Sequence, residues 1–360
     1  MDNSQFFGIA SIAYILAMVA YIAYLVFRNS GIGLVATVLT GVGLAAHTVA
    51  FFVRWKEFYD IGQLGLLRSI PLTNLYESLI FFVWCLIVSY LIIEWKYRNR
   101  SFGAFITPIA GMALAFIDIS GMDKSIHPLL PALQSNWLLA HVTMSFLSYA
   151  TFAISFATGL MYLVVTTDDR KGAAYIFWTV TLGVFMSILI AMGIDFLAFK
   201  VNGSPETFLQ SYLFKASYRS ASGGLVAFSY LATAVFVFVI WQFGYIFKRI
   251  ITSFSLSEDI LEDLTYKSIA VGFPVFTIGG LVFGAIWADQ AWGKYWSWDP
   301  KETWSLITWF VYAFFLHARF IRGWKGHKIA MVAVIGFVCT IFTYLGVNLL
   351  LSGLHSYGGQ

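Results

Sequence analysis

Residues 287–309 read W-A-D-Q-A-W-G-K-Y-W-S-W-D-P-K-E-T-W-S-L-I-T-W and contain six of the chain's 13 tryptophans. This stretch is too polar for a membrane helix, and it lies between two strongly apolar segments. Tryptophan favours the membrane–water boundary because its ring is apolar while its N–H needs a partner. We therefore expect the stretch to lie at that boundary and to form a flat aromatic surface suited to a flat ligand.

The composition is that of a polytopic membrane protein. Of the 360 residues, 59% are hydrophobic and 11% are charged, and the mean hydropathy is +0.78, whereas a soluble domain has about 25% charged residues. The net charge of +4 comes without an arginine-rich patch, so we expect no nucleic-acid partner. The first apolar segment has no basic start or cleavage site of a signal peptide, and we expect it to be a retained span.

The hydropathy pattern predicts an all-α fold with about ten transmembrane helices. A helix that crosses the bilayer needs about 20 apolar residues. Segments that meet this requirement are residues 5–27, 31–53, 73–95, 102–118, 136–165, 173–199, 223–247, 268–288, 303–321 and 329–351.

The distribution of Lys and Arg over the loops predicts that both termini lie on the non-cytoplasmic side. The Trp-rich stretch, the loop 119–135 and the C-terminal tail are then external. The loop 248–267 is then cytoplasmic, and its acidic residues would form one solvated helical face. These residues are Glu258, Asp259, Glu262 and Asp263.

Three histidines are candidate haem ligands. His141 and His355 are both predicted at the outer surface beside the tryptophans, where two imidazoles could bind haem iron. Alternatively, each is an interfacial residue with a hydrogen-bonded ring. His317 lies roughly 22 Å along its predicted helix, and an ionisable residue at that depth suggests a functional site. His47 is a possible partner of His317 by residue type, although the predicted depths of the two do not match.

The segment Asp299-Pro300-Lys301-Glu302 has the pattern of a helix start, with Asp at the N-cap, Pro at the first helical position and Glu two positions later. Asp299 and Glu302 then need no catalytic role, and the cap would fix Trp296 and Trp298 relative to Trp304. The sequence does not decide which outer cation would pair with haem propionates. The candidates are Lys294, Arg54, Arg68 and Arg219.

Residues 292–309 resemble the "WWD" signature of haem-handling membrane proteins, and four other motifs narrow the resemblance to the CcsA (ResC) family of system II cytochrome c biogenesis. These motifs are P-L-T-N-L-Y-E-S at 71–78, P-A-L-Q-S-N-W-L-L-A-H-V at 131–142, F-L-H-A-R at 315–319 and G-V-N-L-L-L-S-G-L-H-S-Y-G at 346–358. The resemblance covers residues 50–165 and 260–358. Two departures are Arg68-Ser69-Ile70-Pro71, where relatives often have Gly-His-Phe-Pro, and residues 173–247, since relatives commonly have eight spans or fewer.

The resemblance implies a protein that exports haem b and presents it for covalent attachment to the CXXCH motif of apocytochrome c, as the CcsA part of a cytochrome c synthase (a haem lyase) that is active with CcsB (ResB). His141 and His355 would be the external ligands of the haem iron and His317 the histidine of an intramembrane haem site. The WWD stretch would hold the porphyrin through Trp292, Trp296, Trp298, Asp299 and Trp304. No residue is expected to act as acid or base.

The family also implies a location in the bacterial plasma membrane, or in the thylakoid membrane, with the active face external. The chain has no C-x-x-C, so thioredoxin-like proteins that keep the apocytochrome thiols reduced would be indirect partners, beside membrane lipid. Four parts follow: 1–172 with the first external histidine, 173–247 as an extra hairpin outside the family core, 248–267 as the acidic loop, and 268–360 with the WWD segment, His317 and His355.

Three other functions fit some of these features. A CcmC-type protein shares the WWD stretch but passes haem to a carrier without forming thioether bonds. A membrane cytochrome b would need two histidines on one helix, and no predicted helix has two. A transporter of a solute other than haem fits the composition alone.

Overall fold

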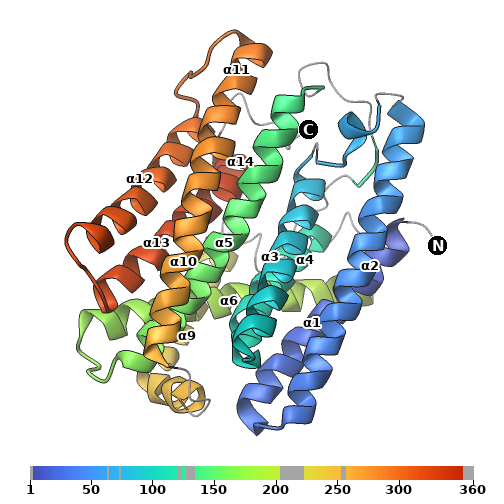
Figure 1. Cartoon of the computed structure of the whole chain (residues 1–360). Coiled ribbons are helices and arrows are strands. Elements are labelled where there is room, and N and C mark those ends of the chain that lie inside the picture. Colours follow the sequence, from blue (N-terminus) through green and yellow to red (C-terminus); the bar gives the residue numbers. More distant parts are fainter. Residues whose placement is uncertain are drawn as a thin grey trace.

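A computed structural model describes residues 3–62, 65–72, 74–119, 124–126, 134–202, 223–252 and 257–351 (Figure 1). This part of the chain is helical and contains no strand. The predicted all-α polytopic membrane fold is therefore confirmed.

The helices follow the predicted spans, although the second helix continues from the predicted end at residue 53 to Gly62. The first seven long helices are α1 (Asn3–Phe27), α2 (Ser30–Gly62), α3 (Leu75–Tyr97), α4 (Gly103–Ile119), α5 (Asn136–Thr166), α6 (Ala173–Asn202) and α9 (Gly223–Thr252). The C-terminal part contains α10 (Glu258–Phe276), η4 (Thr277–Phe283), α11 (Gly284–Trp292), α12 (Pro300–Phe320), α13 (His327–Ile341), η5 (Phe342–Gly346) and α14 (Val347–Leu350). Two short 3-10 turns are η1 (Leu67–Ser69) and η2 (Arg100–Phe102).

Two of the C-terminal rods are interrupted by π-helical turns. The segment η4 joins α10 to α11, and η5 joins α13 to α14. Within the described residues, nine helical rods are long and apolar enough to cross a membrane, counting each interrupted rod once. The more polar α12 is the tenth long rod, and it packs against α10 and α13.

The helix α5 forms the centre of the bundle. It packs against α10 and α13 on one side and α3 on the other (Figure 1). Its small residues allow close packing, and aromatic rings fill the spaces between helices. The rings of Phe152 on α5 and Tyr312 on α12 stack with centroids 3.8 Å apart. By contrast, α9 is peripheral, and little of its apolar window is buried.

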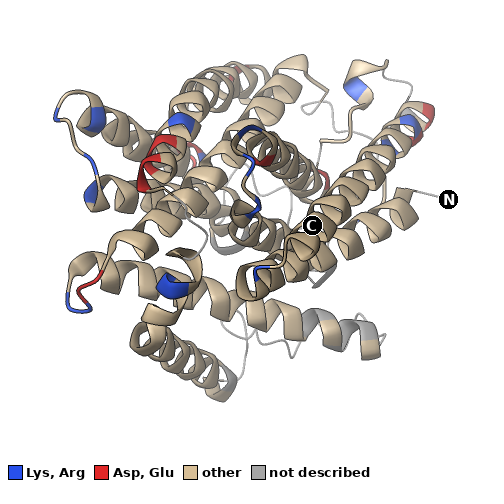
Figure 2. Cartoon of the chain, turned by 60° about the horizontal axis from the view of Figure 1, so that its bottom comes forward, with Lys and Arg blue, Asp and Glu red and all other residues tan. Residues whose placement is uncertain are grey.

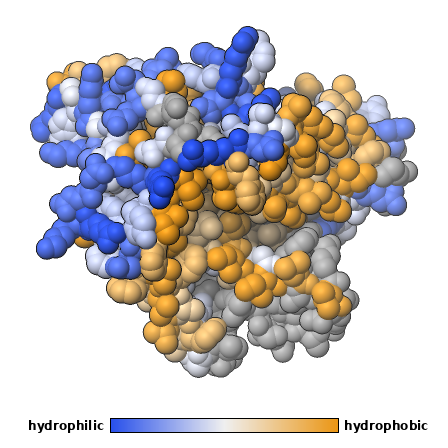
Figure 3. Space-filling view, turned by 90° about the horizontal axis from the view of Figure 1, so that it is seen from below, coloured by the Kyte–Doolittle hydropathy of each residue, from blue (hydrophilic) through white to orange (hydrophobic). Residues whose placement is uncertain are grey.

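Charged residues concentrate at the helix ends and in the loops (Figure 2). The turns that join α1 to α2, α3 to α4 and α12 to α13 lie at the lower end of the bundle (Figure 1). Seen from below, this end has hydrophilic residues over one part and an apolar area beside it (Figure 3). These three turns, all predicted to be cytoplasmic, thus share one end, and which membrane face this end occupies stays a prediction.

The predicted loop 248–267 is mostly helical. The helix α9 continues to Thr252, and α10 begins at Glu258. The difference arises because hydropathy marks where a segment leaves the apolar layer, whereas a helix can continue into water. Its acidic face is also only partly solvated, since Glu262 forms an ion pair with Arg319 of α12.

Candidate functional site

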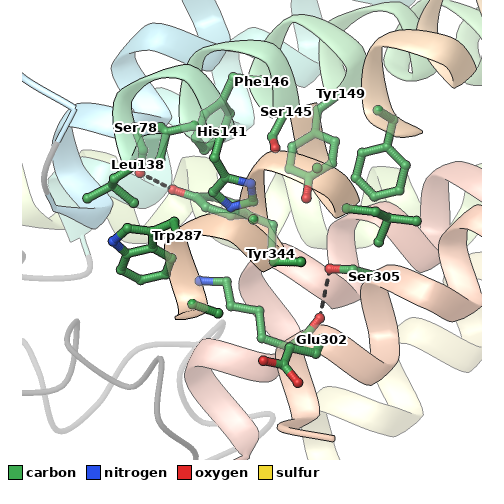
Figure 4. Close-up of a pocket in the computed structure, with 18 of the residues that line it drawn as sticks. Ser78, Leu138, His141, Ser145, Phe146, Tyr149, Trp287, Glu302, Ser305 and Tyr344 are labelled. Atoms are coloured by element: carbon green, nitrogen blue, oxygen red, sulfur yellow. Dashed lines mark hydrogen bonds between the residues drawn. The ribbon is translucent and has the colours of Figure 1, made fainter. Parts of the chain in front are cut away.

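A pocket opens where α3, α5, the α10–α11 rod, α12 and η5 meet, and the residues preceding α12 form one wall (Figure 4). Its volume of about 190 Å³ exceeds that of an internal cavity known to bind a small aromatic molecule. Aromatic side chains from five segments line it, namely Phe146, Tyr149, Phe276, Trp287, Tyr295, Trp296 and Tyr344. Such a site, mostly apolar with a few polar groups, is typical of ligand binding.

His141 projects from α5 into this pocket, as Figure 4 shows. Its Nδ1 lies 2.8 Å from the carbonyl oxygen of Gly279. A carbonyl can only accept, so Nδ1 carries the proton and Nε2 carries the lone pair that can coordinate a metal. The imidazole ring lies nearly parallel to Trp287, with an interplanar angle of 12° and centroids 6.4 Å apart. The geometry thus orients His141 as a metal-ligating histidine is usually oriented.

The carbonyl that orients His141 belongs to the π-helical turn η4. Such turns occur frequently at functional sites because they alter the regular i→i−4 bonding of the backbone. The close approach of η4 and the start of α11 to α5 requires glycine at two positions. A Cβ on Gly279 would lie 2.2 Å from Cβ of Met144, and one on Gly284 would lie 2.9 Å from the His141 ring.

The six tryptophans do not form one flat surface. The rings of Trp287 and Trp292 meet at 67°, and those of Trp296 and Trp298 meet at 86°. Of the six, Trp287 and Trp296 line the pocket. Trp298 is 68% exposed, and its backbone has a φ of 58°, which is uncommon for a residue other than glycine. The expectation of a planar platform is therefore replaced by a wall of tryptophans packed edge to face.

The last two tryptophans hold α12 against its neighbours. The ring of Trp304 packs on Phe342 of η5 with centroids 4.2 Å apart. The indole N–H of Trp309 donates to Thr277 Oγ1 at 2.9 Å. Both contacts connect α12 to π-helical turns near the pocket, although neither tryptophan lines it.

The predicted helix start at Asp299 is confirmed. The Lys301 N–H donates to the Asp299 carboxylate at 3.0 Å, and the Asp299 N–H donates to Glu302 Oε2 at 3.3 Å. The Ser297 N–H donates to the same Glu302 oxygen at 2.7 Å. This reciprocal cap fixes the residues that precede α12, and with them one wall of the pocket.

Sequence reasoning did not assign Lys301 to the site. Its side chain lines the pocket, and its Nζ donates to Asn348 Oδ1 at 3.3 Å. Lys301 precedes the apolar part of α12, and burial lowers the pKa of its amine from the ordinary value to about 8. The helix-cap pattern explained Asp299-Pro300-Lys301-Glu302 as a helix start and gave Lys301 no function. The sequence therefore contained no signal that Lys301 lines the pocket.

The motif at 71–78 reaches the pocket through a contact with η5. The hydroxyl of Tyr344 hydrogen-bonds with that of Ser78 and also donates to the Leu75 carbonyl at 3.3 Å. Ser78 and Tyr344 are 266 positions apart in the chain. This pairing places the start of α3 in the pocket wall, which the sequence did not predict.

The other histidines lie apart from the pocket or outside the described residues. His317 is exposed in the last turn of α12, about 24 Å along the helix from Lys301 at 1.5 Å per residue. His355 lies outside the described residues, so its predicted role is not tested. His47 is buried on α2 near the Tyr14 hydroxyl. Since α2 and α12 lie on opposite sides of the bundle (Figure 1), the structure does not pair His47 with His317.

Among the four cations proposed for propionates, Arg54 is already engaged. Its guanidinium donates to Glu77 at 2.8 and 3.0 Å and to the Lys124 carbonyl at 3.0 Å. Both side chains of the Arg54–Glu77 pair are buried. Arg68 and Lys294 are exposed and do not line the pocket, and Arg219 lies outside the described residues.

The fold and site define a polytopic α-helical membrane protein with a pocket lined by histidine and tryptophan near one end of its helices. Residues 72–355 match the family model for "Cytochrome C assembly protein". The chain is similar to the cytochrome c biogenesis protein CcsA of Microcystis aeruginosa, with 36% identity over 99% of this chain and 96% of the relative. It is 36% identical to CcsA of Gloeobacter violaceus, over 89% and 85% of the two chains. It is 37% identical to CcsA of Marchantia polymorpha, over 80% and 78%.

The chain belongs to the CcsA family of cytochrome c biogenesis proteins. The family identified from the sequence motifs is thus confirmed. Its role is in cytochrome c maturation.

Proposed function

We propose that this chain binds haem b in the pocket and presents it for covalent attachment to the CXXCH motif of apocytochrome c, as the CcsA part of a synthase formed with a CcsB-type partner. The proposal rests on the orientation of His141. Its side chain faces an aromatic pocket, and its Nδ1–H donates to the Gly279 carbonyl. Haem is the substrate in this scheme.

In this proposal the chain contributes binding and orientation. Nε2 of His141 ligates the iron, and His355 is the proposed second ligand. The walls formed by Phe146, Tyr149 and Trp287 pack on the porphyrin and exclude water. Each cysteine thiol of the apocytochrome then adds across a vinyl group of the haem: sulfur bonds to one vinyl carbon and the proton goes to the other. This addition needs no net oxidant and no acid or base from the chain.

His317 belongs to an earlier step in the proposal. Its position near the opposite end of α12 from the pocket agrees with a separate site that haem reaches first. Because the His317 side chain is exposed, residues of another chain would be needed to complete that haem site.

The experiment is co-expression of the full chain with a CXXCH reporter, with and without a CcsB-type partner, followed by a stain for covalent haem. We expect a covalent product that needs both chains and falls at least tenfold in His141→Gly. The matched control is His327→Gln, which changes a histidine bonded to Thr166 outside the pocket. Haem transfer to the reporter without any thioether product would contradict the proposal and favour CcmC-type delivery.

A further inference from the structure

Two polar groups that line the pocket have no protein partner. The indole nitrogen of Trp296 and the hydroxyl of Ser145 are buried, and neither has a hydrogen-bond partner among the described residues. Buried polar groups are almost always hydrogen-bonded, and each exception calls for an explanation. The two groups project from different segments, Ser145 from α5 and Trp296 from the residues that precede α12.

Lys301 adds a positive charge to the same wall. None of the ion pairs in the described part of the chain involves it. Its amine donates to Asn348, and it lies 5.9 Å from the centre of the Tyr344 ring. An amide oxygen and a ring face occupy part of the three-donor capacity of an ammonium group and supply no compensating charge.

The chemistry of these groups indicates which kind of ligand group would bind to them. The indole N–H can only donate, and the ammonium can only donate. A water molecule would accept one of these bonds but would bring no negative charge, and in the ligand-free chain the acidic group that acts on the Lys301 amine is Asp299. A carboxylate has two acceptor oxygens and a negative charge, and charge-assisted hydrogen bonds to it are about twice as strong as neutral ones.

We propose that Nζ of Lys301 and the indole N–H of Trp296 bind a carboxylate group of the ligand in this pocket. The inference rests on the proposed function for the ligand's identity, and for a haem substrate the carboxylate is a propionate. The reciprocal cap between Asp299 and Glu302 fixes the backbone between the two donors, which lie five positions apart in the sequence. The binding site is therefore preorganised.

A carboxylate site at Lys301 would also determine how the porphyrin is oriented in the pocket. The propionates and the vinyl groups of haem lie on different edges of the macrocycle. A propionate held at Lys301 directs the vinyl edge away from the start of α12. The Trp-rich segment then acts on orientation as well as on packing.

The experiment compares two ligands that differ only at the carboxylates. The purified full chain in nanodiscs is titrated with ferric haem and with its dimethyl ester, in which both propionates are blocked. Variants are Lys301→Gln, Lys301→Arg and Trp296→Phe, which keeps an aromatic ring but loses the N–H. The control is Lys294→Gln, which removes an exposed lysine from the same stretch.

We expect the unmodified chain and Lys294→Gln to bind haem about 10- to 100-fold more tightly than the ester, the range for hydrogen bonds to a charged group. In Lys301→Gln the preference should fall below about threefold while the affinity for the ester is unchanged, which shows that the variant is folded. Lys301→Arg should restore most of the preference. Trp296→Phe should reduce it by roughly 3- to 10-fold.

A full preference for haem over the ester in both Lys301→Gln and Trp296→Phe would overturn this inference and leave haem binding intact. Equal affinities of the unmodified chain for the two ligands would do the same. Failure of the unmodified chain to bind either ligand would instead contradict the proposed function itself.

Discussion

One hydrogen bond determines what His141 can do. The Gly279 carbonyl holds the Nδ1 proton, so the basic nitrogen is Nε2. The ring is confined by the parallel face of Trp287 and by the bare backbone of Gly284. Small changes around this residue should therefore alter iron ligation without removing the ligand.

Gly284→Ala tests this confinement. The new Cβ would lie 2.9 Å from Cε1 and Nδ1 of His141, closer than ordinary contact, so the ring must move. We expect haem affinity to fall about tenfold, since a misplaced ligand loses roughly one good bond. The control is Gly41→Ala on α2, where a Cβ meets nothing within 4 Å. Equal haem affinities of the two variants in an absorption titration would contradict the account.

The lowered pKa of Lys301 predicts a pH dependence of ligand binding. The amine has a pKa of about 8 in the ligand-free chain, and Asp299 acts to raise it. Glu302, His141 and Tyr344 also line this part of the pocket. A bound carboxylate favours the charged amine and raises its pKa further, so binding above pH 8 requires proton uptake. The preference for haem over its dimethyl ester should begin to fall between pH 7 and 8, where the free amine starts to lose its proton, and should fall more steeply as the pH rises further.

The measurement is the ratio of the two affinities between about pH 7 and 10, since effects of pH on the iron are common to both ligands. In Lys301→Arg the ratio should stay level, because arginine remains charged over this range. A decline of the same steepness in Lys301→Arg would show that another group is responsible.

The segment that precedes α12 takes part in the cap of this helix and also forms one wall of the pocket. Its cap satisfies the Lys301 N–H in the first turn of the helix, and the bonds from Ser297 and Asp299 to Glu302 hold the residues between Trp296 and Lys301. The positive φ of Trp298 is a strained conformation that the surrounding contacts must maintain. The order of this short segment thus depends on the helix start.

Asp299→Ala should loosen both the helix start and the pocket wall. Loss of an N-cap costs about 1 kcal/mol, so amide exchange in the first turn of α12 should accelerate about fivefold. Asp299→Asn keeps an acceptor and should behave like the unmodified chain. The control is Ser257→Ala at the N-cap of α10, where the side chain makes no cap bond. Unchanged exchange in Asp299→Ala would show that the cap does not stabilise this turn.

For the molecule as a whole, the α1–α2 pair is joined to the rest of the bundle near the pocket end by a buried ion pair. Arg54 of α2 and Glu77 of α3 are exposed by 3% and 1%. Arg54 also donates to Lys124 in the segment between α4 and α5. The pair therefore connects three segments, and the same first turn of α3 contributes Ser78 to the pocket.

Arg54→Leu should destabilise the chain by about 3 to 5 kcal/mol, because it removes the guanidinium that forms an ion pair with a buried carboxylate. The double variant Arg54→Leu/Glu77→Leu should recover much of this loss, since it removes both charges. Thermal unfolding in nanodiscs measures the effect, with the exposed Arg68→Leu as control. Similar unfolding temperatures of Arg54→Leu and Arg68→Leu would indicate that the pair contributes little.

The structural features that depend on local sequence patterns could be predicted from the sequence. Hydropathy gave the helical rods, and the D-P-K-E pattern gave the start of α12 at Pro300. It also placed His317 roughly 22 Å along its helix, but the helical count did not reveal that its side chain is exposed. Helix periodicity does carry this information, because the buried residues Thr308, Tyr312, Phe315 and Ala318 lie on the opposite face of α12 from His317.

The pocket could not be predicted, because it depends on contacts between distant segments. Ser78 and Tyr344 meet across most of the chain length, and no pattern in either segment indicates the other. The π-turn at Gly279 and the edge-to-face packing of the tryptophans depend on close packing of several helices. The unpartnered N–H of Trp296 becomes visible only when its surroundings are known.

The most direct test of the central claim is the absorption spectrum of ferrous haem bound to the purified chain and to His141→Gly. Since the claim is that Nε2 of His141 ligates the iron, we expect the variant to lose the six-coordinate low-spin spectrum. Added imidazole should fill the space left by the side chain and restore that spectrum. An unchanged spectrum in His141→Gly, without imidazole, would contradict the assignment of His141 as an iron ligand.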